Sequence, residues 1–289
     1  MISNLVKAVK SRKPKKILLQ LPDGLRMKAL EIANELEKSG IAVIVSGEPC
    51  YGACDLRDDE ARKAKCDMLV HVGHIKFYKK IKTKIPVLYY PWAIAGDISG
   101  VDFSAIKEKR IGLLTTVQHM ESIKEVAKKL EKIGKKAVVG GHVLGCWTQN
   151  AEKIKSKVDA FLFIGSGRFH ALGVKGKVYC LDVEKKKIES VDNMLFEKKR
   201  YARIFKAKDA AIFAILVSTK QGQFDLKKAE AIKKCLEKRD KKAFILIMDE
   251  ITDEKLLGIK ADMFINTACP RLFDAMNVLN AEDVDEIWK

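Results

Sequence analysis

The chain has 289 residues, of which 47% are apolar and 32% charged, so it is long enough to bury more than one core. It contains no apolar run of the roughly 18 residues that a membrane-spanning helix needs, and its N-terminus lacks a signal peptide pattern, so we expect a cytoplasmic protein with no membrane partner. The net charge of +17, carried by 55 basic and 38 acidic residues, is typical of a solvated surface or of a protein with an acidic macromolecular partner.

Strand-like and helix-like segments alternate along the whole chain, which is the pattern of parallel α/β sheets. The first stretch has strand-like segments at 15–24, 41–50, 66–74 and 85–92, with helices at 25–40 and 56–65. The second has strands at 109–118, 136–146, 158–167 and 177–182, with helices at 120–135 and 150–157. The third has strands at 208–223, 241–250 and 261–270, with helices at 225–240 and 252–259.

An aspartate before an apolar run recurs in each stretch, at Asp67, Asp159 and Asp262. The repeat length of about one hundred residues is typical of duplicated domains. We therefore predict an α/β protein of three similar small domains, each a parallel sheet flanked by helices, packed around a central site. The predicted domains are residues 1–98, 99–190 and 191–289.

The seven cysteines do not have the even number and small chain of a disulfide framework. Cys54, Cys146 and Cys269 each follow a strand, one per repeat, at the sheet edge where ligands of α/β proteins bind. A helix is predicted after each, with Asp55 as a candidate N-cap and Pro270 at a first helical position. A helix N-terminus stabilises the thiolate that binds metal, so three thiolates could meet at one point.

The other cysteines divide into two groups. Cys66, Cys180 and Cys235 lie in strand-like or amphipathic segments and are predicted to fill cores. The role of Cys50 stays open on spacing alone. No CxxC pair occurs, which argues against structural zinc, whereas an iron–sulfur cluster with three thiolate ligands and one open iron position is the sharper hypothesis.

Several motifs together resemble the archaeal catalytic subunit of diphthamide synthase, a family of 3-amino-3-carboxypropyl transferases. They are "GEPCYGACDL", "VLGCWTQN" and "NTACPRL" on successive repeats, with "LQLPDGL", "HVGH" and "IGSGRFHALG". The resemblance implies a homodimer of three-domain subunits in which Cys54, Cys146 and Cys269 hold a 4Fe-4S cluster. Eukaryotic relatives resemble this sequence at "YGAC" but not at Cys50, which favours Cys54.

The same resemblance implies the reaction. The reduced cluster cleaves the Cγ–S bond of S-adenosyl-L-methionine, and the 3-amino-3-carboxypropyl radical adds to C2 of a histidine of translation elongation factor two, the first step of diphthamide biosynthesis. The family uses an electron donor, needs no catalytic residue beyond the cluster, and is not expected to bind nucleic acid directly. The usual CxxxCxxC run of radical S-adenosylmethionine enzymes is absent.

Three loops are candidate contacts for S-adenosyl-L-methionine, because glycines allow close approach and loop donors bind carboxylates; each is also compatible with a structural turn. Their candidate residues are Asp23 and Gly24; Gly165, Ser166, Gly167 and His170; and Lys220, Gln221 and Gly222. His74, whose role stays open, and His170 are the histidines we single out for testing.

Two other functions are weighed against this one. A nucleotide- or RNA-binding protein without redox chemistry would fit the basic charge, but no phosphate-binding glycine loop or arginine and aromatic platform occurs. A non-catalytic scaffold subunit is disfavoured because all three cysteines are present.

Overall fold

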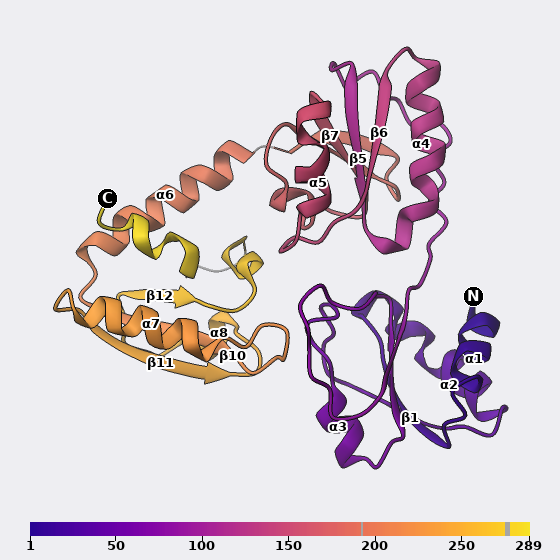
Figure 1. The fold of residues 1–289 in the computed structure, drawn as a ribbon, viewed down its shortest axis with the longest axis horizontal. Coiled ribbons are helices and arrows are strands. Elements are labelled where there is room, and N and C mark those ends of the chain that lie inside the picture. The colour runs from indigo at the N-terminus through magenta and orange to yellow at the C-terminus, as the bar shows by residue number, and fades with distance from the viewer. Residues whose placement is uncertain (192, 275–277) are drawn as a thin grey trace. The chain divides into compact units, whose positions relative to one another are not determined.

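The computed structural model describes residues 1–191, 193–274 and 278–289. Three separate sheets account for the strands of these residues (Figure 1). In the described residues no helix is both long and apolar enough to cross a membrane.

The first sheet has the strand order β2-β1-β3-β4, and all its pairs are parallel. The elements of this part are α1 (Ile2–Lys10), β1 (Lys16–Gln20), the 3-10 helix η1 (Asp23–Lys28), α2 (Ala29–Glu37), β2 (Ala42–Val45), α3 (Asp58–Lys63), β3 (Met68–Val72) and β4 (Val87–Tyr90). β1 and β3 are apolar and buried, so they form the centre of the sheet. Ile32 and Leu36 of α2 pack with Leu19 in the core on one face of the sheet.

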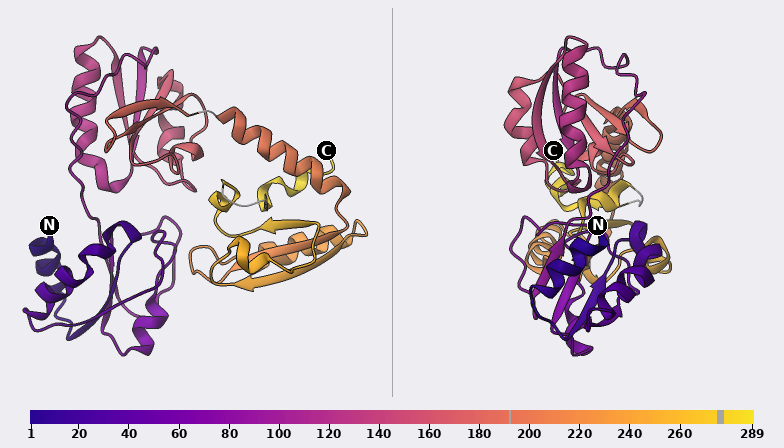
Figure 2. Two further views of the ribbon diagram at one scale, coloured as in Figure 1. Left: turned by 180° about the vertical axis from the view of Figure 1, so that it is seen from behind. Right: turned by 90° about the vertical axis from the view of Figure 1, so that its right-hand side faces the viewer.

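The second sheet has the order β6-β5-β7-β8-β9. Its elements are β5 (Arg110–Thr115), η2 (Val117–His119), α4 (Met120–Lys132), β6 (Lys136–His142), α5 (Gln149–Ile154), η3 (Lys155–Lys157), β7 (Ala160–Gly165), η4 (Ala171–Gly173), β8 (Val178–Asp182) and β9 (Lys187–Ser190). Figure 2 shows α4 running along this sheet. Ile123 and Val126 of α4 are buried against Leu162 because apolar residues recur at helical spacing.

The third sheet has the order β11-β10-β12-β13, again with parallel pairs. Its elements are α6 (Asn193–Asp209), β10 (Ile212–Ser218), α7 (Leu226–Glu237), β11 (Lys242–Met248), α8 (Asp253–Leu256), β12 (Met263–Asn266), η5 (Pro270–Asp274), β13 (Leu279–Asn280) and η6 (Ala281–Glu286). Helix α7 begins as its sequence predicts, because Asp225 accepts a hydrogen bond from Lys228 N as N-cap.

The repeated aspartate makes the same contact in all three sheets. Each carboxylate accepts backbone N–H groups at the start of the sheet's first strand, and each lies directly before the third strand. The bonds are Asp67 to Lys15 N and Lys16 N, Asp159 to Arg110 N, and Asp262 to Ala211 N and Ile212 N. The backbone bonds lower the pKa of the Asp67 and Asp262 carboxyl groups. The Arg110 side chain is the main cause that lowers the pKa of Asp159, and the backbone bond adds to it. The three sheets therefore share one hydrogen-bonding arrangement, which confirms the repeat inferred from the sequence.

The chain forms two compact units. Unit 1 is Met1–Val143, Gln149–Gly167 and Gly176–Glu189, and it contains the first two sheets. Unit 2 is Leu144–Thr148, Arg168–Lys175 and Ser190–Lys289, and it contains the third. Each of the ranges 1–98, 99–190 and 191–289 holds one sheet, and their boundaries as domains stay a prediction.

Candidate functional site: three anchored cysteine loops

The loop that carries Cys54 is fastened to β1 by Gln20. The Gln20 side chain is fully buried at the carboxyl end of that strand. Its Nε2 donates to Asp55 O at 2.6 Å, and its Oε1 accepts from Arg57 N at 3.3 Å. One amide therefore fixes the backbone immediately after Cys54.

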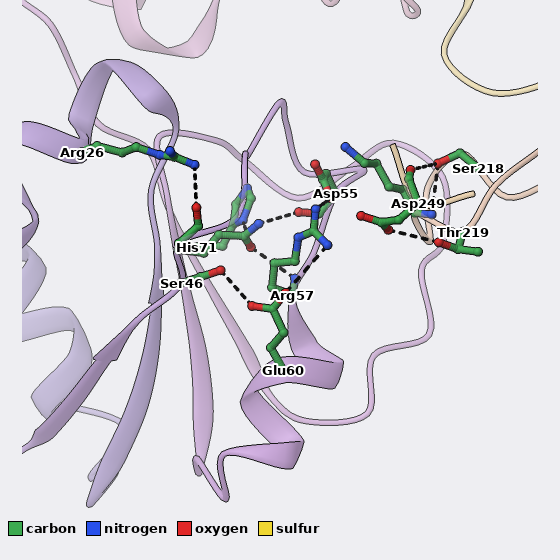
Figure 3. Close-up of polar contacts among 12 residues, drawn as sticks. Arg26, Ser46, Asp55, Arg57, Glu60, His71, Ser218, Thr219 and Asp249 are labelled. Atoms are coloured by element: carbon green, nitrogen blue, oxygen red, sulfur yellow. Dashed lines mark hydrogen bonds and ion pairs between the residues drawn. The ribbon is translucent and has the colours of Figure 1, made fainter. Parts of the chain in front are cut away.

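The Asp55 side chain is not the N-cap that the sequence predicts. It is buried and lies 3.3 Å from Arg57 Nη2. Arg57 also approaches Glu60, which accepts a 2.8 Å bond from Ser46 (Figure 3). Because this buried ion pair occupies Asp55, α3 begins only at Asp58 with Arg57 at its N-cap position, so the helix starts four residues after Cys54.

The loop that carries Cys146 is held by His170. Gly145 N donates to His170 Nδ1 at 3.0 Å, so this nitrogen carries the lone pair. Leu144 and Trp147 exchange two backbone hydrogen bonds around Cys146. The cysteine thus lies in a closed turn whose position depends on the histidine.

The loop that carries Cys269 is held by Asn266 at the end of β12. Asn266 Nδ2 donates to Cys269 O at 2.8 Å, and its Oδ1 accepts from Ala268 N at 2.9 Å. Pro270 begins the 3-10 helix η5, at the position that the sequence predicts.

The segments of Cys146 and Cys269 pack together within unit 2. A Cβ added at Gly145 would lie 2.9 Å from Arg271 Cγ and 3.2 Å from Phe169 Cε1. Arg271 is buried, and its guanidinium lies over the rings of Phe169 and Phe196. The absence of a side chain at Gly145 is what lets the backbone beside Cys146 touch the helical turn after Cys269.

The seven cysteines all lie in described residues, and none is in a disulfide. Cys54, Cys146 and Cys269 are half-buried, as is Cys235 in α7, whereas Cys50, Cys66 and Cys180 are buried. Burial is the main cause that raises the pKa of the Cys50 thiol to about 12, with the Asp55 carboxylate adding to it. Cys66 and Cys180 are the core residues that the sequence predicts, and Cys50 is a protonated thiol at neutral pH.

Two histidines near Cys50 lie against each other. His71 Nε2 and His74 Nδ1 are 3.1 Å apart, and His71 Nδ1 is 2.9 Å from Gln20 Oε1. Burial lowers the pKa of His71 to about 3, with His74 contributing, and burial lowers the pKa of His74 to about 4. Both imidazoles are therefore neutral at physiological pH.

Two of the loops predicted to contact S-adenosyl-L-methionine lie at the ends of β1 and β7. Asp23 and Gly24 open η1, where Asp23 pairs with Arg26 at 3.0 Å. Gly165 ends β7, Ser166 Oγ donates to Glu184 at 3.0 Å, and Gly167 has a left-handed φ of +72°. A substitution at Gly167 would therefore be strained.

The third loop follows β10 and is anchored from the neighbouring strand. Thr219 Oγ1 donates to Asp249 Oδ1 at 3.0 Å, and Ser218 Oγ donates to Asp249 O at 2.8 Å (Figure 3). Lys220 is buried and its carbonyl accepts two turn hydrogen bonds, from the backbones of residues 223 and 224. The loop of Lys220, Gln221 and Gly222 is thus ordered by its own unit.

The residues that sequence reasoning missed are the ones that hold the loops. They are Gln20, Gly145, Asn266 and Arg271. A signal existed for two of them, because Gln20 and Asn266 are polar residues at the ends of apolar runs, where a buried amide needs hydrogen-bond partners. No pattern in the sequence marked Gly145 or Arg271.

Comparison with known proteins decides the family. The family model described as "Putative diphthamide synthesis protein" matches residues 21–274. The chain belongs to this family. It is 35% identical to the 2-(3-amino-3-carboxypropyl)histidine synthase of Pyrococcus horikoshii, over 93% of this chain and 83% of that protein. It is 31% identical to subunit 1 of the same synthase from Caenorhabditis elegans, over 91% of this chain and 72% of that protein.

Solved structures of the diphthamide synthesis family share the fold. The crystal structure of Dph2 from Pyrococcus horikoshii with a 4Fe-4S cluster has a TM-score of 0.88 and 35% identity, covering 99% of this chain and 89% of that one. The predicted fold class is confirmed by this match and by the three sheets.

Proposed function

We propose that this chain is a 2-(3-amino-3-carboxypropyl)histidine synthase that carries out the first step of diphthamide synthesis. The single observation that carries the proposal is its similarity, over nearly its whole length, to a Dph2 structure with a 4Fe-4S cluster. Three cysteines in loops that hydrogen bonds hold at the carboxyl ends of the strands also support the proposal.

Cys54, Cys146 and Cys269 are the ligands we propose for one 4Fe-4S cluster. Thiolates are the usual ligands of such clusters. These three are half-buried, on loops fastened by Gln20, His170 and Asn266, which fits a group that must be reached by a substrate. When bound, the cluster supplies the electron that cleaves the Cγ–S bond of S-adenosyl-L-methionine.

The residues of this chain would then position the cysteine loops and orient S-adenosyl-L-methionine. His170 Nδ1 accepts a hydrogen bond from Gly145 N, so we assign His170 first to positioning the Cys146 loop. This role is in addition to its predicted place near the substrate. Gly165, Ser166, Gly167, Asp23 and Gly24 stay proposed contacts. So do Lys220, Gln221 and Gly222, where the Lys220 ammonium would complement the substrate carboxylate.

The protein substrate we propose is a histidine of translation elongation factor two, and we expect a cytoplasmic homodimer served by an electron donor. The surplus of positive charge is +7 for residues 1–100 and +8 for 101–190, against +2 for 191–289. The first two ranges therefore offer the stronger attraction to an acidic partner surface.

The test uses anaerobically purified protein with reconstituted cluster, a chemical reductant and S-adenosyl-L-methionine. We expect about four irons per subunit, formation of methylthioadenosine, and modification of elongation factor two. Cys54→Ala, Cys146→Ala and Cys269→Ala should each lose iron and activity, whereas Cys235→Ala should keep both. Colourless wild-type protein that does not cleave the substrate would overturn the proposal, and iron retained in all three variants would overturn the ligand assignment.

A further inference from the structure

Cys50, His71 and His74 form a compact group of metal-binding side chains within unit 1. One donor atom from each lies within 4.8 Å of the other two. The two nearest nitrogens, His71 Nε2 and His74 Nδ1, are 3.1 Å apart. Donors around a tetrahedral zinc ion lie roughly 3.3–3.6 Å apart, since zinc bonds are about 2.0–2.3 Å long. Small side-chain rotations would therefore bring all three onto one ion.

The hydrogen bond from His71 to Gln20 prepares the histidine for such a role. Gln20 Nε2 donates to Asp55 O, which leaves Gln20 Oε1 as the acceptor toward His71 Nδ1. His71 therefore carries its proton on Nδ1 and its lone pair on Nε2, the atom that faces His74. Metal-binding histidines usually have such an oxygen acceptor on the other ring nitrogen, which fixes the tautomer and the ring plane.

The surroundings of the group also suit a metal ion. His71 is fully buried, Cys50 is 5% exposed and His74 is partly exposed. Neutral imidazole is the form of histidine that binds metal. In the tautomer set by Gln20, His71 Nε2 accepts a hydrogen bond from His74 Nδ1 at 3.1 Å. A metal ion would replace this bond, with the His74 proton moved to Nε2 and the Cys50 proton released to solvent.

We propose that Cys50, His71 and His74 bind a zinc ion in a site separate from the cluster cysteines. The ligand set of one thiolate and two imidazoles is soft enough to select zinc over magnesium or calcium. Three protein ligands leave a fourth position for water or a substrate group. The site gives a role to Cys50, whose neighbour Cys54 we assign to the cluster. The zinc proposal goes beyond the proposed function and does not depend on it.

The test measures zinc and iron in the same samples of full-length protein, produced with added zinc and purified anaerobically. We expect about one zinc per subunit beside the cluster iron. Cys50→Ser and His74→Asn should lose zinc and keep iron, while Cys54→Ala should lose iron and keep zinc. Cys66→Ser, at a buried cysteine that lies two residues before β3 and outside the group, is the matched control and should keep both metals.

Cobalt replaces zinc as a spectroscopic probe. Cobalt bound to the wild-type protein should show thiolate charge-transfer absorption, and Cys50→Ser should lack it. Thermal melts without added metal check that the variants fold, and His74→Asn, at a partly exposed position, serves if Cys50→Ser does not.

Two results would overturn the proposal: a wild-type protein without zinc, or zinc retained in both Cys50→Ser and His74→Asn. Iron lost together with zinc from a well-folded Cys50→Ser would also overturn it, because Cys50 would then serve the cluster. If the protein binds zinc as expected but does not cleave S-adenosyl-L-methionine, only the proposed function would be contradicted.

Discussion

At the scale of single residues, the three cysteine loops depend on polar side chains, of which Gln20 and Asn266 are buried and His170 is partly exposed. Gln20, His170 and Asn266 each bind the backbone within one residue of a proposed ligand. Removing one partner of a buried hydrogen bond destabilises the fold by more than the bond contributes when it forms. The reason is that the remaining polar group has neither a protein partner nor water to bond with. Loss of Gln20, His170 or Asn266 should therefore disturb the loop that the side chain holds.

Asn266→Leu tests this for the Cys269 loop. The change leaves Ala268 N and Cys269 O without their side-chain partner, so we expect a loss of about 1–3 kcal/mol in the free energy of unfolding and lower iron content after reconstitution. Denaturant melts and iron analysis measure the two effects. Asn34→Ala on the exposed side of α2 is the control, and an unchanged iron content in the Asn266 variant would contradict the anchoring role.

Gly145→Ala tests the contact between the Cys146 and Cys269 segments. The new Cβ would lie 2.9 Å from Arg271 Cγ, so the side chain or the loop must shift, at a cost of about 1–3 kcal/mol. We expect less cluster and slower cleavage of S-adenosyl-L-methionine. Gly47→Ala, whose added Cβ meets nothing within 4 Å, should behave like wild type; equal iron content in the two variants would refute the prediction.

At the scale of elements, the aspartate before each third strand clamps the start of the first. The clamp uses a charged acceptor with backbone donors, the stronger class of hydrogen bond. Because the pKa of Asp262 is lowered in the folded chain, the clamp contributes its full stability above the ordinary value of 3.8 and loses it as the pH falls through the folded value.

Asp262→Asn should therefore lower the melting temperature at neutral pH. The difference from wild type should shrink as the pH falls below about 4 and should vanish below the lowered pKa of folded Asp262, where the wild-type carboxyl group is also neutral. Calorimetric melts between neutral and acidic pH measure it, with Glu230→Gln on the exposed face of α7 as the control. A difference that is constant with pH would show that the charge contributes nothing.

Helix α6 illustrates what the sequence did not predict. The sequence predicts no element between residues 182 and 208, where most of α6 lies. Its apolar residues form no single stripe, and Met194, Tyr201 and Phe205 are exposed. Ile204 and Ala207 pack it into the core of the third sheet. A polar contact adds to this packing, since Arg200 Nε donates to Asp283 Oδ1 at 2.7 Å and the guanidinium also binds Glu286. This partner is more than eighty residues away, a distance over which no local pattern operates.

Arg200→Met should cost about 2 kcal/mol in the free energy of unfolding, because it leaves the buried Asp283 carboxylate without its partner. The figure is below that of a fully buried pair, since Arg200 is itself partly exposed. Lys199→Met on the exposed side of α6 is the control in denaturant melts. Equal stability of the two variants would show that the ion pair does not hold the helix.

For the site too, features set by local sequence patterns could be predicted, whereas contacts between residues far apart in the chain could not. The strands and the positions of Cys54, Cys146 and Cys269 at their ends follow from periodicity. The Asp55 N-cap failed because a buried ion pair with Arg57 competes for the carboxylate. The histidine and cysteine group was missed because Cys50 and His71 are 21 residues apart and meet only through the sheet.

At the scale of the whole molecule, the charge of +17 should govern the encounter with the protein substrate. Electrostatic attraction raises association rates and is screened by salt. We expect the association rate with elongation factor two to fall steeply as salt is raised, and the dissociation rate to change little.

Charge-reversed lysines locate the attraction. Lys→Glu changes within residues 1–190 should flatten the salt dependence more than the same number within residues 191–289, which serve as the control. Stopped-flow association measures both sets, and equal slopes would contradict the assignment.

The strand order is the same in the three sheets up to their fourth strand, and each carries the aspartate clamp at the same place. This shared plan is what successive duplications of one ancestral gene segment would leave behind. The cysteine loops do not follow this shared plan in full, because Cys54 and Cys146 come after the second strand of their sheets in chain order and Cys269 comes after the third. The side chains that hold the loops differ in the same way, since Gln20 ends a first strand and Asn266 ends a third strand. We infer that the cysteine loops were specialised after the duplications that produced the three sheets.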